Sequence, residues 1–137
     1  MTSDPARPFG RVLTAMVTPL AEDGSIDLAG AQELAAHLID RQAHDGLVVL
    51  GTTGEAPTIS DGEQHAVLEA VMDAVGDRAV VVAGVGTNDT AHSVDLARSA
   101  ERLGVHSGPI VGAQVSPSTF RSTSVTTSRS ACGRNAV

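Results

Sequence analysis

The sequence contains no lysine, tyrosine or tryptophan, and each absence excludes a kind of chemistry. All nine of its basic residues are arginine. A Schiff base with a carbonyl substrate needs an amine, which lysine normally supplies, and a phenolic proton donor has to be a tyrosine. No side chain among the 137 residues offers either group.

Cysteine, positive charge and long apolar runs are also scarce. The single cysteine, Cys132, cannot form an internal disulfide, which favours a reducing compartment. The net charge of −7 argues against a nucleic-acid or anionic-membrane partner. No apolar run reaches the ~18 residues of a membrane-spanning helix. Residues 1–9 also lack the basic segment followed by an apolar segment that is typical of a signal peptide. We therefore expect a cytoplasmic protein.

The distribution of charge divides the chain near residue 106. All 16 acidic residues lie between Asp4 and Glu101, whereas residues 107–137 are rich in serine, threonine and arginine. We expect residues 1–106 to form part of a domain and residues 107–137 to form an irregular tail. A shifted reading frame would also produce such a change, and translating the gene in all frames across this boundary tests that hypothesis.

Apolar patterning in the first part alternates between strand and helix. Continuous apolar runs predict strands over residues 11–17, 46–50 and 79–83. Helical spacing follows each run, with Asp27 and the Ser60 and Glu63 capping box as starting signals of the first two helices. The third helix is predicted over residues 87–103, with residues 88–90 as turn and cap. Strands without alternation are typical of a parallel α/β sheet, either doubly wound or part of a (β/α)8 barrel. A full barrel needs ~250 residues.

Parallel α/β folds place their sites in the loops at the carboxyl ends of the strands. The loop Gly51-Thr-Thr-Gly-Glu55 combines hydroxyls with accessible backbone amides, which suits a small carboxylate; a tight turn capped by its threonines is the alternative. A G-x-G-x-x-G dinucleotide-binding fingerprint that began at Gly84 would need glycine at position 89, and Asp89 occupies that position. The histidines lack zinc spacing, so we expect no metal or other cofactor.

Three ordered motifs together resemble the dihydrodipicolinate synthase family: AMVTP at 15–19, DGLVVLGTTGE at 45–55 and VVAGVGTNDT at 81–90. The resemblance covers about residues 9–106 and implies the first three βα units, approximately, of a (β/α)8 barrel. It implies a homotetrameric Schiff-base lyase that condenses pyruvate with aspartate semialdehyde in lysine and diaminopimelate biosynthesis. By this resemblance Thr52 relays a proton, Thr53 holds the pyruvate carboxylate, and Gly51 and Ala15 shape the pocket.

The resemblance stops after His106, where the family continues towards its tyrosines, a substrate-binding arginine and the Schiff-base lysine. We therefore expect this chain to be inactive alone, and poorly soluble or molten when expressed as a monomer. Two alternatives stay open. The chain is part of an N-acetylneuraminate lyase-like enzyme or another pyruvate aldolase, or it is a non-catalytic half-barrel that binds a partner chain.

Overall fold

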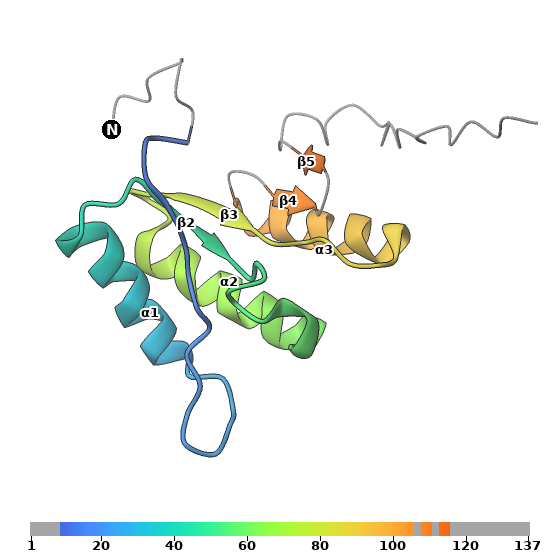
Figure 1. The fold of residues 1–137 in the computed structure, drawn as a ribbon, viewed down its shortest axis with the longest axis horizontal. Coiled ribbons are helices and arrows are strands. Elements are labelled where there is room, and N and C mark those ends of the chain that lie inside the picture. The colour runs from blue at the N-terminus through green and yellow to red at the C-terminus, as the bar shows by residue number, and fades with distance from the viewer. Residues whose placement is uncertain (1–8, 106–107, 111–112, 116–137) are drawn as a thin grey trace, which may run out of the picture.

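The computed structural model describes residues 9–105 together with the backbone of 108–110 and 113–115. Its main sheet has three parallel strands in the order β1-β2-β3. Helices follow these strands along the chain, as the apolar patterning predicts (Figure 1). The elements are β1 (Leu13–Ala15), α1 (Leu28–Ala36), a π-helical turn (His37–Arg41), β2 (Gly46–Val49), a 3-10 turn (Ala56–Thr58), α2 (Asp61–Val75), β3 (Val80–Ala83) and α3 (Thr90–Arg102).

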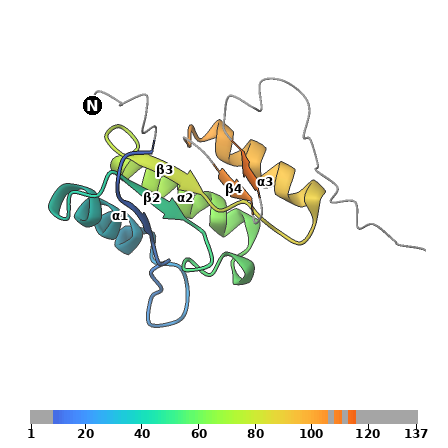
Figure 2. The same ribbon diagram turned by 45° about the horizontal axis from the view of Figure 1, so that its top comes forward.

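One face of the sheet is buried under the helices, and the other is open at β1, although Val82 of β3 is buried there. Leu47, Val49 and Val81 point into a core that they share with residues of all three helices. On the opposite face Leu13 pairs in register with Gly46, and Leu13 remains 40% exposed. Figure 2 shows the blue strand β1 beside β2, with α1 and α2 packed behind the sheet. A sheet covered by helices on one side only is expected for part of a barrel.

The predicted helix starts are confirmed by their hydrogen bonds. The Asp27 carboxylate accepts from the Gly30 N–H at 2.8 Å, and Ser60 with Glu63 forms the complete capping box. The Asp89 carboxylate accepts from the Ala91 N–H, and this cap starts the third helix at Thr90 rather than at the predicted residue 87. Each cap satisfies N–H groups that the first helical turn leaves without partners.

The first strand is shorter than the predicted residues 11–17, and Asp45 explains where it begins. Its carboxylate accepts from the N–H groups of Arg11 (2.6 Å) and Val12 (2.9 Å), so that side chain satisfies the donors of this backbone. The Val12 carbonyl accepts from the Asp45 and Gly46 N–H groups at 3.0 and 3.2 Å. A Cβ added at Gly10 would lie 2.2 Å from the Asp45 Cβ, so glycine is required where the chain passes this side chain. These hydrogen bonds lower the pKa of the Asp45 carboxyl below its usual value.

We expect Asp45→Asn to lower the melting temperature by a few degrees at neutral pH and to flatten its dependence on pH. A carboxyl whose pKa is lowered by folding stabilises the fold above its ordinary pKa of ~3.9, and that contribution is lost as the pH falls through the lowered value. Thermal melts between neutral and acidic pH at one protein concentration measure the effect. Asp73→Asn, an exposed change on α2, is the control; equal profiles for both variants would contradict the prediction.

Within the predicted irregular tail the structure describes two short strands. Strands β4 (Gly108–Ile110) and β5 (Ala113–Val115) form an antiparallel pair, in a sheet separate from β1-β2-β3. Residues 116–137, including Cys132, lie outside the described residues. None of the helices in the described part combines the length and apolar character that a membrane crossing requires.

Candidate functional site

The loops after the three parallel strands come together, as the topology predicts. The Thr18 hydroxyl donates to the Gly54 carbonyl at 2.7 Å, which joins the loop after β1 to the loop after β2. The Gly84 N–H donates to the Val49 carbonyl at 2.7 Å, which joins the start of the loop after β3 to the end of β2. The carboxyl-terminal edge of the sheet therefore presents one continuous set of loops.

The backbone of the 51–55 loop turns tightly at both ends. Leu50 and Glu55 adopt left-handed conformations, with φ of 57° and 56°, and the Gly54 N–H donates to the Gly51 carbonyl at 3.1 Å. Gly54 is buried, and a Cβ added there would lie 3.2 Å from the Met16 carbonyl. Left-handed residues other than glycine are uncommon and recur at binding sites, where surrounding contacts maintain them.

The two threonines of this loop keep their hydroxyls available. Thr52 and Thr53 are exposed, and neither hydroxyl makes a hydrogen bond to any residue that the structure describes. The turn is thus closed by backbone bonds and by Thr18, not by the threonines that the alternative interpretation assigned to capping. Two free hydroxyls beside backbone amides at a turn are groups that bind a small anion without a basic side chain.

The other candidate pocket residues lie at or beside this loop. Ala15 is the last residue of β1 and pairs in register with Val48, so both face the open side of the sheet. Gly51 follows Leu50 directly, and a Cβ added at Gly51 would make only ordinary contact, 3.6 Å from Val48 Cγ1. Ala15, Gly51, Thr52 and Thr53 therefore belong to neighbouring loops and strand ends, while their individual roles stay predictions.

The loop after β3 is organised around structural hydrogen bonds. The buried Ser93 hydroxyl accepts from the Thr87 N–H at 2.9 Å and donates to the Asp89 carbonyl at 2.9 Å. Ser93 was not predicted from the sequence, although a polar residue on the inward face of an amphipathic helix is a signal for it. Asp89 caps α3, as the sequence predicted.

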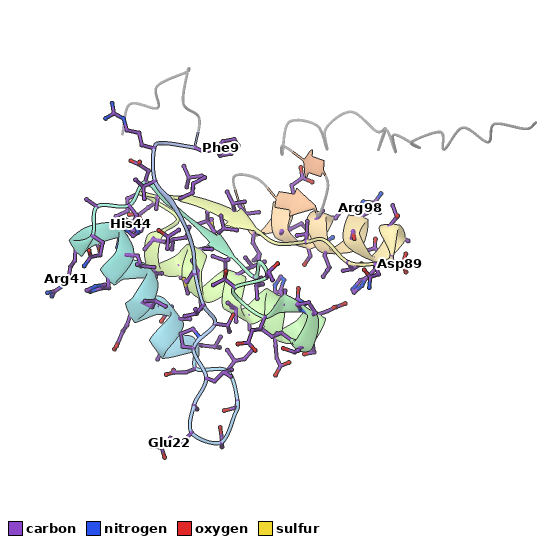
Figure 3. The ribbon with its side chains drawn as sticks, viewed as in Figure 1. Phe9, Glu22, Arg41, His44, Asp89 and Arg98 are labelled. Atoms are coloured by element: carbon purple, nitrogen blue, oxygen red, sulfur yellow. The ribbon has the colours of Figure 1, made fainter. Side chains whose placement is uncertain are left out.

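The described histidines are dispersed over the molecule. His44 accepts from or donates to Thr14 at 2.6 Å, and His92 pairs with Asp61 at 2.9 Å. Figure 3 shows His44 at the opposite side of the molecule from Asp89, where α3 begins. Within the residues that the structure describes, no group of three or more histidine, cysteine, aspartate or glutamate side chains is placed to hold a metal ion.

The parallel βα order and the site at the strand ends define the beginning of a (β/α)8 barrel. The sequence of residues 8–113 matches the model of the Dihydrodipicolinate synthetase family. The chain belongs to this family. The match extends beyond residue 106, where the resemblance of the motifs ended, and includes β4.

Individual relatives support this assignment. Over 105 residues the chain is 65% identical to 4-hydroxy-tetrahydrodipicolinate synthase 2 of Streptomyces coelicolor, covering 77% of this chain and 35% of that protein. A dihydrodipicolinate synthase from Bacillus anthracis has a similar structure, with a TM-score of 0.71 at 41% identity, covering 74% of this chain and 35% of that one. N-acetylneuraminate lyase from Mycoplasma synoviae gives a TM-score of 0.69 at 30% identity, with coverages of 73% and 35%. The chain spans about a third of the length of the curated relatives it matches.

Proposed function

We propose that this chain carries the pyruvate-binding loop of a 4-hydroxy-tetrahydrodipicolinate synthase. Such an enzyme condenses pyruvate with aspartate semialdehyde in lysine and diaminopimelate biosynthesis. The 65% identity to a protein of that name supports this activity for the whole enzyme. In the proposal Thr53 binds the pyruvate carboxylate, Thr52 relays a proton, and Gly51 and Ala15 shape the pocket. The whole enzyme is a cytoplasmic homotetramer, and residues 1–106 supply its first βα units.

The observation that carries the proposal is the exposed, unused pair of hydroxyls on Thr52 and Thr53. A carboxylate accepts hydrogen bonds only, so a threonine hydroxyl and adjacent backbone N–H groups match it. A hydroxyl also donates and accepts at once, which a proton relay requires. The structure shows no competing internal partner for either group among the described residues.

This chain by itself supplies only part of the chemistry. The reaction begins with a primary amine attacking the pyruvate carbonyl, and no lysine is present among the 137 residues. The proposal therefore assigns substrate binding to the 51–55 loop and leaves bond formation to an amine from outside this chain. Residues 114–137, which the family model does not match, are in the same proposal not part of the barrel.

Titration with pyruvate tests the binding role. We expect the backbone amide resonances of residues 51–54 to shift with pyruvate and not with pyruvamide, which lacks the charge. Thr53→Val should weaken binding at least tenfold, because a hydrogen bond to a charged group contributes ~1.5–3 kcal/mol and ~1.4 kcal/mol is a factor of ten. Thr90→Val, at the exposed first residue of α3, is the matched control. Equal binding of pyruvate and pyruvamide, or an unaffected Thr53→Val, would refute the assignment.

A second candidate is a lyase of the N-acetylneuraminate type, supported by the backbone likeness to the Mycoplasma synoviae enzyme. Its 30% identity is less than half of the 65% found for the synthase, which favours the synthase. Both candidates use the same pyruvate loop, so the titration tests that shared role and not the second substrate.

A further inference from the structure

The Thr18 hydroxyl restrains the 51–55 loop from a distant part of the sequence. It donates to the Gly54 carbonyl at 2.7 Å, across a separation of 36 residues. Within the described part of the chain, no other group donates to this carbonyl. The Gly54 and Glu55 N–H groups, by contrast, donate to carbonyls of the loop itself. Thr18 therefore ties the loop to the end of β1 with a side chain that lies outside it.

The backbone on both sides of Thr18 is fixed by hydrogen bonds. The Met16 N–H donates to the Val48 carbonyl of β2 at 2.9 Å. The Pro19 carbonyl accepts from the Asp27 N–H at 3.0 Å. A residue before proline is confined to extended conformations, and a β-branched side chain has few χ1 rotamers. The Thr18 hydroxyl thus reaches the loop from a segment with little freedom to move.

The loop depends on such a restraint because its backbone is strained. Leu50 and Glu55, on either side of the two threonines, are left-handed, with φ of 57° and 56°. Residues other than glycine keep this conformation where surrounding contacts maintain it. The bond from Thr18 holds the peptide that joins the buried Gly54 to Glu55. Without it, the carbonyl of a buried residue loses its donor beside a strained one.

We propose that Thr18 is a positioning residue: its hydroxyl holds the 51–55 loop in the conformation that binds the pyruvate carboxylate. In this scheme Thr18 makes no contact with pyruvate and transfers no proton. A loop that is ordered before binding loses less conformational entropy when the ligand arrives, so the restraint strengthens binding. The inference rests on the proposed function, since it names the group that prepares the pyruvate loop.

Amide hydrogen exchange of the full chain without ligand tests the restraint directly. Thr18→Val keeps the shape of the side chain and removes the hydroxyl. We expect the Gly54 and Glu55 N–H groups of this variant to exchange about fivefold faster, the factor that corresponds to ~1 kcal/mol for one hydrogen bond. Thr18→Ser, which keeps the hydroxyl, should restore slow exchange.

Thr14→Val is the matched control for a general loss of stability. Thr14 is also a half-buried threonine at β1, and its hydroxyl bonds the His44 ring at 2.6 Å, away from the 51–55 loop. Exchange at Val71, which is fully buried on α2, reports global opening in every variant. The faster exchange should be confined to the loop of Thr18→Val.

Titration with pyruvate gives the second readout. Thr18→Val should bind pyruvate about fivefold more weakly, by the same conversion, while Thr18→Ser and Thr14→Val should bind like the unmodified chain. A merely structural role would lower the stability of both valine variants and leave pyruvate binding by the folded molecules unchanged.

The two readouts separate failure of this inference from failure of the proposed function. Loop exchange that is equal in Thr18→Val and Thr14→Val would overturn the inference whether or not pyruvate binds. Undiminished pyruvate binding by Thr18→Val would overturn it as well. If the unmodified chain binds no pyruvate while loop exchange still depends on Thr18, the proposed function fails and the restraint by Thr18 stands.

Discussion

Incubation of this chain with pyruvate and borohydride should leave the mass of its side chains unchanged. Borohydride traps a Schiff base only after a neutral primary amine has attacked the carbonyl. All nine basic residues are arginine, whose guanidinium stays protonated in proteins. Intact mass spectrometry measures the outcome, and a full-length synthase of the family under the same conditions is the positive control.

The α-amino group is the remaining primary amine of the polypeptide, and with a pKa of ~7.7–8.0 an appreciable fraction of it is neutral and able to react near neutral pH. Acetylation of this group removes that route. An adduct on the acetylated chain, located by peptide mapping to any internal residue, would contradict the prediction. The result is independent of the pyruvate titration, since carboxylate binding needs no amine.

The substitution Gly84→Ala should prevent this chain from reaching its folded state. A Cβ at Gly84 would lie 1.9 Å from the Leu50 carbonyl oxygen and 2.5 Å from its carbon, so backbone atoms have to move. Leu50 is buried and already left-handed, and it leads into the 51–55 loop. We expect a loss of about 3 kcal/mol or more of unfolding free energy, a large fraction of a small domain's stability.

Far-UV circular dichroism and the soluble fraction at one protein concentration measure this effect. Gly62→Ala is the matched control, because an added Cβ there meets nothing within 4 Å and alanine favours the helical conformation of α2. It should be neutral or slightly stabilising. A Gly84→Ala chain with the helical signal and urea midpoint of the control would show that the contact with Leu50 does not restrict the fold.

Local and periodic patterns were read correctly from the sequence because their physical causes lie within a few residues. The cap at Asp27 and the box of Ser60 with Glu63 join groups three residues apart. The apolar spacing along α2 predicts which face of the helix is buried, even though it does not identify what covers that face. Val67 and Val71 on this face are fully buried. The same locality explains why the start of the last helix was placed a few residues early, since Thr87 and Asp89 both carry capping signals.

Much of the candidate site was also accessible from sequence. Loops that follow parallel strands must meet at one edge, so the position of Thr52 and Thr53 followed from topology. The family assignment came from three motifs whose order and spacing match, and residues 8–113 confirm it. The roles of these threonines are predictions that ligand binding has to test.

Only the tertiary structure decided the features whose partners are distant along the chain. Asp45 lies 34 residues from the Arg11 amide that it binds, and Thr18 lies 36 residues from the Gly54 carbonyl. The left-handed Leu50 and its close approach to Gly84 depend on the packing of two strands, and nothing in the local sequence announces them. The sequence by itself determines features whose causes lie within a few residues of each other along the chain, such as helix caps and the apolar faces of helices. It also determines the order in which strands and helices follow one another. Where strands end and which hydroxyls stay free depend on contacts that exist only once the chain has folded.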